Sequence, residues 1–374
     1  MISKIKEFFQ RRPQIKIKEK DDYIERLEAK MLSRMGRPLN GQIDLTYQCN
    51  LKCRHCFIVR EEDREELKFK EIISIIDKIY EVGCLWLCFS GGEPFLREDF
   101  LGIYSYARKK GFFINIFTNG TLITKDVADY LAKIPPYSIE ITLNGITQQT
   151  YEEVTGVQGS FVKAMRAIQL IKKRRIPLVL KANGMKINRD ELLKIKQFSE
   201  ELLGKKRFRC DLLLYPGMDG SKKPCNLRLT ADEILDIQYS DEDMLSLCRE
   251  QFIHAKEDLR LKQGYLFPCG LSSFHIDPYA KMRLCSFIKE PYIDLKKEEF
   301  LEGFIRLYRY LQGLEFKRET KCRSCKINYL CRQCPGRALV ENGDMETPVE
   351  FFCELAHKQE EMREGVMKTV ANRE

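Results

Sequence analysis

Between residues 41 and 217, apolar runs of strand length alternate with longer segments in which apolar residues recur every three or four positions. The first pattern is typical of buried strands and the second of amphipathic helices. This βαβ alternation predicts a parallel sheet with helices packed on it. The expected strands are residues 42–46, 84–89, 112–118, 138–143, 178–182 and 208–215, and the expected helices are residues 70–82, 100–110, 124–134, 161–174 and 188–203.

Six strands separated by five helices favour an α/β fold of the partial (β/α)6 barrel type. A doubly wound open sheet also fits the periodicity, but the GxGxxG phosphate-binding pattern expected of such a sheet is not found. In both kinds of sheet, ligands bind beyond the carboxyl ends of the strands. Five loops at these ends contain small or polar residues and are therefore expected to meet at one rim: residues 49–56, 91–94, 119–120, 144–145 and 181–183.

The barrel is expected at residues 41–217, and three further regions are expected outside it. Residues 1–40 are expected to form a charged helical segment before the barrel, the lead-in. Residues 218–268 are expected to form a helical segment after it, the bridge, with helices at 230–238 and 243–261. Residues 269–374 predict a second, cysteine-rich domain that ends in a helix. Seven cysteines lie between positions 269 and 353, and apolar residues are sparse between them, so this region needs a covalent or metal staple to fold.

Composition indicates whether this staple is a disulfide or a metal. The chain has 15 cysteines, an odd number, and its basic N-terminus lacks the apolar core and cleavage site of a signal peptide. The cysteines are therefore expected to stay reduced in the cytoplasm, where a staple is metal rather than disulfide. No apolar run approaches the roughly 18 residues needed to span a membrane, so no membrane partner is expected.

The net charge of the chain adds little to these expectations about partners. The net charge is +9, from 64 Lys and Arg against 55 Asp and Glu, in a chain that is 44% hydrophobic. A modest positive excess favours an acidic partner such as a peptide or a nucleic acid. Charges of both signs are mixed along most of the predicted helices, which indicates solvated faces rather than a nucleic-acid surface. A nucleic-acid partner is therefore not expected.

Three cysteines directly after the first predicted strand form the pattern CxxxCxxC: Cys49, Cys53 and Cys56. Three thiolates from one tight loop can hold three irons of a cubane and leave the fourth iron open to a small molecule. Zinc is the alternative, but it requires a fourth ligand at a matched spacing, and His55 lies inside the loop. The segment LTxxCNxxCxHC resembles the cluster loop of the radical S-adenosylmethionine (radical SAM) enzymes.

The segment Gly91-Gly92-Glu93-Pro94 matches a second motif of that family. Two adjacent glycines let the backbone approach a ligand closely. The resemblance implies that this segment contacts the amino group of SAM, and that the amino and carboxylate groups of SAM chelate the open iron. It further implies reductive cleavage of SAM to a 5'-deoxyadenosyl radical, with flavodoxin or ferredoxin as the type of electron donor.

By the same resemblance, the His55 backbone is an adenine contact, and Asn119, Thr142 and Lys181 are candidates for ribose or carboxylate contacts. Two alternatives stay open. Asn119 begins an Asn-Gly pair, a strong turn signal, and Lys181 could be solvated or paired with a carboxylate. The remaining cysteines of the barrel and bridge are expected to be small buried hydrophobes: Cys84, Cys88, Cys210 and Cys225. The single tryptophan, Trp86, is expected in the core.

The C-terminal cysteines resemble the SPASM domain, which binds two auxiliary four-iron clusters in related enzymes. Ala280 stands where that domain usually has glycine. The resemblance implies one ligand set for a nearer cluster, Cys269, Cys285 and Cys334, and another for a distal cluster, Cys322, Cys325, Cys331 and Cys353. For the nearer cluster, either Cys248 or His275 completes the set or one iron is open to substrate. A zinc knuckle is the alternative for the CxxC pairs.

The resemblance implies a peptide or protein substrate, and the first hypothesis is a maturase of a ribosomally made peptide. Residues 1–40 are too short for the leader-binding module of some relatives, so recognition is expected on another surface or a separate protein. Ser286 replaces the acidic residue of sulfatase-maturing relatives, which lowers that possibility. The alternatives are a small-molecule enzyme resembling the molybdenum-cofactor cyclase, and an iron-sulfur electron carrier or scaffold. A carrier would need neither an open iron nor the GGEP segment.

Overall fold

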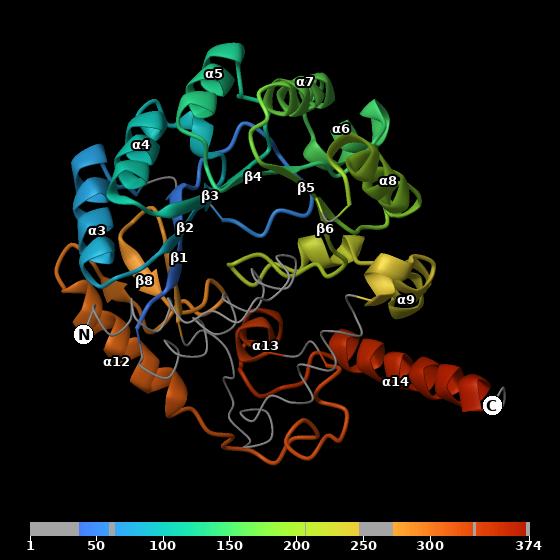
Figure 1. The fold of residues 1–374 in the computed structure, drawn as a ribbon. Helices are drawn as coiled ribbons and strands as arrows, with labels where there is room; N and C mark the ends of the chain where they lie inside the picture. The colour runs from blue at the N-terminus through green and yellow to red at the C-terminus, as the bar shows by residue number, and fades with distance from the viewer. Residues whose placement is uncertain (1–36, 60–63, 206, 247–271, 332–333, 372–374) are drawn as a thin grey trace, which may run out of the picture.

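The computed structural model describes residues 37–59, 64–205, 207–246, 272–331 and 334–371. Six strands lie parallel in the order β6-β5-β4-β3-β2-β1 and curve into the partial barrel that the sequence predicts (Figure 1). Their bounds are β1 (Asn40–Thr46), β2 (Trp86–Gly91), β3 (Phe113–Thr118), β4 (Ser138–Thr142), β5 (Leu178–Asn183) and β6 (Phe208–Asp211). The predicted strands match within two residues, except that β6 ends at Asp211 instead of residue 215.

Helices cover the outer face of the curved sheet (Figure 1). They are α3 (Phe69–Glu81), α4 (Phe100–Lys110), α5 (Lys125–Lys133), α6 (Gln148–Thr155), α7 (Ser160–Lys173) and α8 (Leu192–Leu203). In α3, isoleucines spaced three or four residues apart, among them Ile72, Ile76 and Ile79, are buried in the core. Thr124 accepts a hydrogen bond from the Val127 N–H and so caps α5, as predicted.

Two local predictions were wrong. Helix α6 was not expected, because its sequence is mostly polar and shows no clear apolar stripe; the Thr147 hydroxyl caps it by accepting from the Thr150 N–H. Asn188 does not cap α8 with its side chain. That side chain instead donates to the Asn144 carbonyl at 3.0 Å and the Asn183 carbonyl at 2.9 Å. It therefore ties the ends of β4 and β5 together.

The cysteine-rich region continues the sheet of the barrel. Strand β7 (Ser273–Ile276) pairs in parallel with β1, and β8 (Lys281–Arg283) and β9 (Ile293–Asp294) follow in antiparallel order. Among the described residues the result is one nine-stranded sheet. The remaining helices are α9 (Ala231–Tyr239) of the bridge, and α12 (Phe300–Gln312), α13 (Pro335–Asn342) and α14 (Glu350–Ala371) beyond the last strands.

The junction between β1 and β7 depends on a glycine. A Cβ at Gly41 would lie 2.0 Å from the ring of Phe274, so only glycine lets that ring lie against β1. Phe274 in turn packs edge-to-face on Phe300 of α12, with ring centroids 5.0 Å apart. Both phenylalanines belong to the same core as the barrel helices. Apolar burial therefore ties the cysteine-rich region to the barrel.

Parts of some predictions fall outside the described residues. These are residues 1–36 of the lead-in, residues 247–261 of the second bridge helix, and Cys248 and Cys269. Within the described part of the chain, no helix is long and apolar enough to cross a membrane.

Candidate functional site

The three cysteines of the CxxxCxxC pattern lie in one loop directly after β1. The Cys56 N–H donates to the Cys53 carbonyl at 3.1 Å, and the Leu51 N–H donates to the Cys49 sulfur at 3.4 Å. Burial, together with the charges of Cys56 and Cys49, raises the pKa of the Cys53 thiol to about 12. The structure thus brings the three sulfurs within electrostatic range of one another, where a bound cation would favour their thiolate forms.

Helix α6 holds this loop in place. The Lys52 N–H donates to the Thr155 carbonyl at 2.9 Å, and the Arg54 N–H donates to the Val154 carbonyl at 3.0 Å. These two carbonyls belong to the last turn of α6, where helix carbonyls lack partners within the helix. The Arg54 guanidinium also pairs with Glu153 of α6 at 3.0 Å. The unexpected helix is therefore a support for the cysteine loop.

The glycines of the GGEP segment allow β2 to approach the same loop. Gly91 has φ +128, and a Cβ there would lie 2.1 Å from the Thr46 carbonyl oxygen. A Cβ at Gly92 would lie 2.1 Å from the Gln48 oxygen. The Gly92 N–H donates to Thr46 at 2.7 Å, and the Glu93 N–H donates to Gln48 at 2.8 Å. Residues with side chains at 91 and 92 would push the segment away from the chain that leads into Cys49.

Glu93 is fully buried and points towards the end of β3. Its carboxylate accepts from the Thr118 hydroxyl at 2.7 Å, the Asn119 N–H at 2.8 Å and the Phe95 N–H at 3.2 Å. Burial raises the pKa of Glu93 to about 7, although these three donors favour the anion. Pro94 begins a 3-10 turn after it. Glu93 therefore connects the GGEP segment to the loop after β3.

Replacing Glu93 with glutamine is expected to remove one component of the pH dependence of stability. Because the pKa is raised from 4.5 to about 7, the native state binds a proton that the unfolded chain releases. The stabilisation from this proton is full below pH 4.5 and is lost as the pH rises through 7, an effect of about 3 kcal/mol. Urea unfolding of the cluster-free protein across this range measures it. Equal slopes in Glu93→Gln and the parent protein would contradict the assignment.

Asn119 contacts the cysteine loop directly. Its side-chain amide donates to the Asn50 side-chain oxygen at 3.0 Å and lies 3.8 Å from the Cys49 sulfur. Its own side-chain oxygen accepts from the Thr121 N–H at 2.8 Å, and Gly120 has φ +77. The position thus has the turn geometry that the Asn-Gly pair predicts, and its side chain also lies beside the first cysteine.

His55 is clamped between the ends of β4 and β5. The side-chain amides of Asn144 and Asn183 lie 3.4 Å and 3.2 Å from His55 Nε2, so Nε2 accepts and the proton is on Nδ1. Burial lowers the pKa of His55 to about 4 and keeps the ring neutral. Nδ1 is buried and has no partner among the described residues. The sequence assigned only the backbone of His55 a role, and Asn144 and Asn183 were expected only as rim loop residues.

Lys181 and Thr142 lie opposite each other on β5 and β4. The Lys181 ammonium is 3.3 Å from the buried Glu140 carboxylate and 3.5 Å from the centre of the Phe117 ring. Arg209 of β6 pairs with the other Glu140 oxygen at 3.2 Å. Lys181 is therefore paired with a carboxylate, which was the alternative expected from the sequence. Contact of Lys181 or Thr142 with SAM stays a prediction.

Three of the four cysteines of the predicted distal set are neighbours, and the fourth, Cys331, lies near the start of α14. Burial raises the pKa of Cys322, and the charges of Cys325 and Cys353 raise it further, so these three sulfurs are neighbours. The Cys331 sulfur lies 3.7 Å from the Phe352 carbonyl, next to Cys353.

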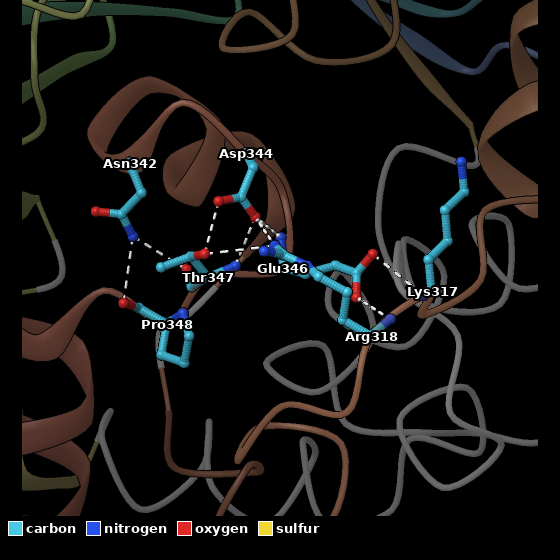
Figure 2. Close-up of polar contacts among 7 residues, drawn as sticks. All are labelled: Lys317, Arg318, Asn342, Asp344, Glu346, Thr347 and Pro348. Carbon is cyan, nitrogen blue, oxygen red and sulfur yellow. Dashed lines mark hydrogen bonds and ion pairs between the residues drawn. The ribbon is translucent and has the colours of Figure 1, made fainter.

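The loop between α13 and α14 holds the segment that leads to these cysteines (Figure 2). The Glu346 carboxylate accepts from the backbone N–H groups of Lys317 at 3.1 Å and Arg318 at 3.0 Å. Asp344 accepts from the Thr347 hydroxyl at 2.6 Å and pairs with the Arg318 guanidinium. Hydrogen bonds from Thr347 lower the pKa of Asp344 to about 2. The two carboxylates thus fix the segment before Cys322 to the loop that precedes α14.

Two cysteines of the predicted nearer set meet at the start of α13. The Cys334 sulfur accepts from the Arg337 N–H at 3.3 Å and caps this helix. A Cβ at Gly336 would lie 3.0 Å from the Cys285 sulfur, so Cys285 is adjacent to the same turn. The third member, Cys269, and one candidate fourth ligand, Cys248, lie outside the described residues.

The other candidate fourth ligand, His275, is buried on β7. Its Nε2 is 2.8 Å from the Asp44 carboxylate of β1, and its Nδ1 has no partner in the described part of the chain. Ala280, in the turn between β7 and β8, has φ +69. This left-handed conformation favours glycine, so Ala280 adopts the backbone geometry for which the related domain uses glycine.

The other residues that the sequence places in the core differ in how deeply they are buried. Cys84 is buried in the main core, as predicted, whereas Cys88, Cys210 and Cys225 are half-buried. Trp86 was expected in the core but is half-buried. It stacks on Phe113 at 4.7 Å, at the end of the barrel opposite to the cysteine loop.

The ligand atoms that the two cysteine groups offer are of the type that iron-sulfur clusters require. Soft thiol sulfurs gather in one loop after β1 and in a second group between α12 and α14, which is the ligand chemistry that such clusters require. Among the described residues, no three His, Cys, Asp or Glu side chains converge tightly enough to hold a single metal ion. A cubane is bound by sulfurs that lie farther apart than the ligands of one ion.

Comparisons with known proteins agree with this geometry. Residues 43–199 match the model of the radical SAM superfamily. The AdoMet-dependent heme synthase of Methanosarcina barkeri is 22% identical over 80% of this chain and 92% of its own length. The PqqA peptide cyclase of Granulibacter bethesdensis is 31% identical, but the match spans only 40% of each protein.

Solved structures share the fold over most of the chain. Streptococcus suis SuiB bound to its precursor peptide SuiA superimposes with a TM-score of 0.68, at 18% identity, over 86% of this chain and 77% of SuiB. The matched family segment contains the cysteine loop, the GGEP segment, the barrel strands β2 to β5 and the second half of β1. Enzymes of this family use a four-iron cluster and SAM. Residues 43–199 of this protein are therefore identified as a radical SAM domain.

Proposed function

We propose that this protein cleaves SAM reductively and uses the resulting radical to modify a peptide or protein substrate. The observation that supports this most strongly is that one continuous sheet carries the cysteine loop and the GGEP segment and extends into the region that contains the second cysteine group. SuiB has the same fold and was solved with a precursor peptide. The PqqA peptide cyclase matches this chain over part of its length.

In this proposal Cys49, Cys53 and Cys56 hold the SAM-binding cluster. When bound, the cluster and SAM supply a 5'-deoxyadenosyl radical that abstracts hydrogen from the substrate. The backbone of the GGEP segment, residues 91–94, binds SAM beside the loop, and Asn119 orients the first cysteine. His55, held neutral by burial and positioned by its two asparagine partners, closes the β4 and β5 side of the site against water.

The second cysteine group is proposed to hold two auxiliary clusters. The distal one uses Cys322, Cys325, Cys331 and Cys353, and the nearer one uses Cys285 and Cys334 together with Cys269. The neighbouring sulfurs described above support the first set and two members of the second.

The iron content tests this. The anaerobically reconstituted protein is expected to contain about twelve irons per chain, as three four-iron clusters. Cys325→Ala removes a ligand of the distal cluster and is expected to lose about four of them, while SAM cleavage without substrate continues. Iron and zinc analysis measures this. A wild-type content of about four irons, or zinc in their place, would refute the auxiliary clusters.

Two further parts of the proposal concern the cellular setting. A single-electron donor of the flavodoxin or ferredoxin type supplies the electron, and a net charge of +9 favours an acidic donor. The working compartment is the reducing cytoplasm, consistent with 15 cysteines and a family that depends on reduced clusters.

A tetrapyrrole is the second candidate substrate. It is favoured by the heme synthase match, which spans more of this chain than the PqqA cyclase match. The deciding experiment incubates the reconstituted enzyme, SAM and reductant with deuterated short peptides encoded near the gene, and separately with an iron tetrapyrrole. A peptide mass change with deuterium in 5'-deoxyadenosine supports the proposal. Conversion of the tetrapyrrole alone would overturn it.

A further inference from the structure

The Tyr151 hydroxyl is a buried polar group whose hydrogen-bonding capacity is unused in the described part of the chain. Tyr151 lies on α6 and is 1% exposed. Its hydroxyl has no hydrogen-bond partner among the described residues. A buried hydroxyl without a partner costs about 1–3 kcal/mol, and phenylalanine would avoid this cost at the same position. Such a group is expected to have a partner in some state of the protein.

The surroundings of the hydroxyl indicate which state. Burial raises the pKa of Tyr151, and the charge of Cys53 raises it further, ahead of the charges of Glu93 and Cys49. The hydroxyl is therefore within electrostatic range of the central cysteine of the loop. Glu93 already accepts three hydrogen bonds, from Thr118, Asn119 and Phe95, whereas the Cys53 sulfur would gain acceptor strength on becoming a thiolate.

The position of Tyr151 is also fixed relative to the loop. Two backbone hydrogen bonds join the last turn of α6 to Lys52 and Arg54, on either side of Cys53. At the start of α6, a Cβ at Gly145 would lie 2.5 Å from the Tyr151 N–H, so the chain packs tightly there. The ring itself packs on Phe161 with centroids 5.7 Å apart. The helix that supports the loop thus also fixes the position of Tyr151 relative to it.

We propose that Tyr151 is a positioning residue whose hydroxyl donates a hydrogen bond to the Cys53 sulfur when this sulfur is bound as a thiolate. Hydrogen bonds to cluster sulfurs are among the factors that set the reduction potential of an iron-sulfur cluster. A donor at this point stabilises the more negative, reduced cluster and raises its potential. The inference rests on the proposed cluster site but not on the identity of the substrate.

The test is a redox titration of Tyr151→Phe, which keeps the ring and removes only the oxygen. The cluster to follow is the one whose electron paramagnetic resonance signal changes when SAM is added. Its midpoint potential is expected to become more negative, and each 59 mV of shift is a tenfold smaller reduced-to-oxidised ratio at fixed solution potential. An unchanged potential in a fully loaded Tyr151→Phe protein would overturn the inference.

Tyr104→Phe is the matched control. Tyr104 is also fully buried, but its hydroxyl donates to the Ile134 carbonyl at 2.6 Å, and no cysteine contributes to its pKa. Its loss is expected to lower stability and leave the cluster potential unchanged. An equal shift in both variants would assign the effect to a general loss of packing and contradict a role specific to Tyr151.

If Tyr151→Phe does not take up the cluster, 3-fluorotyrosine introduced at position 151 decides the matter. It keeps the shape and the hydroxyl but is a stronger hydrogen-bond donor, so the potential is expected to rise. An unchanged potential would overturn the inference. Absence of any SAM-sensitive signal in the wild-type protein would instead refute the proposed cluster site itself, which separates the two failures.

Discussion

Replacing Cys53 with alanine is expected to abolish formation of 5'-deoxyadenosine from SAM. A cubane held by three thiolates of one loop cannot lose one ligand and keep both its position and its open iron. Cys53 is the central ligand of the proposed set, and its neighbours on both sides are fixed to α6 by backbone hydrogen bonds. No other thiol of the loop can therefore move into its place. Chromatography of the products after reduction with dithionite measures the loss.

The control for this variant is Cys225→Ala. Cys225 is a half-buried thiol in the short 3-10 turn η3 (Lys223–Leu227). The charges that act on its pKa come from Arg228, Glu341 and Lys222 rather than from the loop cysteines, so its removal is expected to leave SAM cleavage unchanged. Normal turnover by Cys53→Ala with a full complement of iron would show that the cluster is held elsewhere. Loss of turnover in both variants would indicate a general sensitivity of the fold to cysteine loss.

Replacing Arg228 with alanine is expected to cost about 3–5 kcal/mol of unfolding free energy. Arg228 follows η3 in the bridge, and both its terminal nitrogens donate to Glu341 of α13, at 2.7 Å and 2.6 Å. Its Nε donates to the Leu214 carbonyl at 2.8 Å, and its guanidinium lies 4.8 Å from the centre of the Phe351 ring. Arg228 thus joins the barrel, the bridge and both C-terminal helices.

The size of this effect follows from burial. The side chains of Arg228 and Glu341 are only 10% and 11% exposed, so removing the arginine leaves an unpaired carboxylate in a poorly solvated site. The control is Lys358→Ala, which breaks a more exposed pair with Asp232 and is expected to cost about 0–1 kcal/mol. Urea unfolding followed by circular dichroism compares the two. A cost below about 1 kcal/mol for Arg228→Ala would contradict the proposed role of this pair.

Hydrophobic periodicity was sufficient to predict the barrel. Its strands are buried apolar runs and its helices have regular apolar faces, as in α3, so local sequence and tertiary environment agree. The meeting of the cysteine loop with Gly91 and Asn119 also followed, because the carboxyl ends of parallel strands share one rim. The ligand and SAM-binding roles of these residues stay predictions.

The features that the sequence did not indicate are those fixed by tertiary contacts. Helix α6 has a polar sequence, and its last turn is hydrogen-bonded to a loop about a hundred residues earlier, so neither it nor Tyr151 showed a periodic signal. The two-asparagine clamp on His55 depends on the neighbouring ends of β4 and β5. The parallel pairing of β7 with β1 joins residues more than two hundred positions apart, and no local pattern specifies such a partner.

The central claim is that the loop of Cys49, Cys53 and Cys56, beside the GGEP segment, is a centre that cleaves SAM. The most direct measurement is anaerobic reconstitution with iron and sulfide, reduction with dithionite in the presence of SAM, and quantification of 5'-deoxyadenosine and methionine. Both products are expected to form in equal amounts, at a rate that increases with protein concentration. A protein with a full four-iron cluster in this loop that leaves SAM intact would contradict the account.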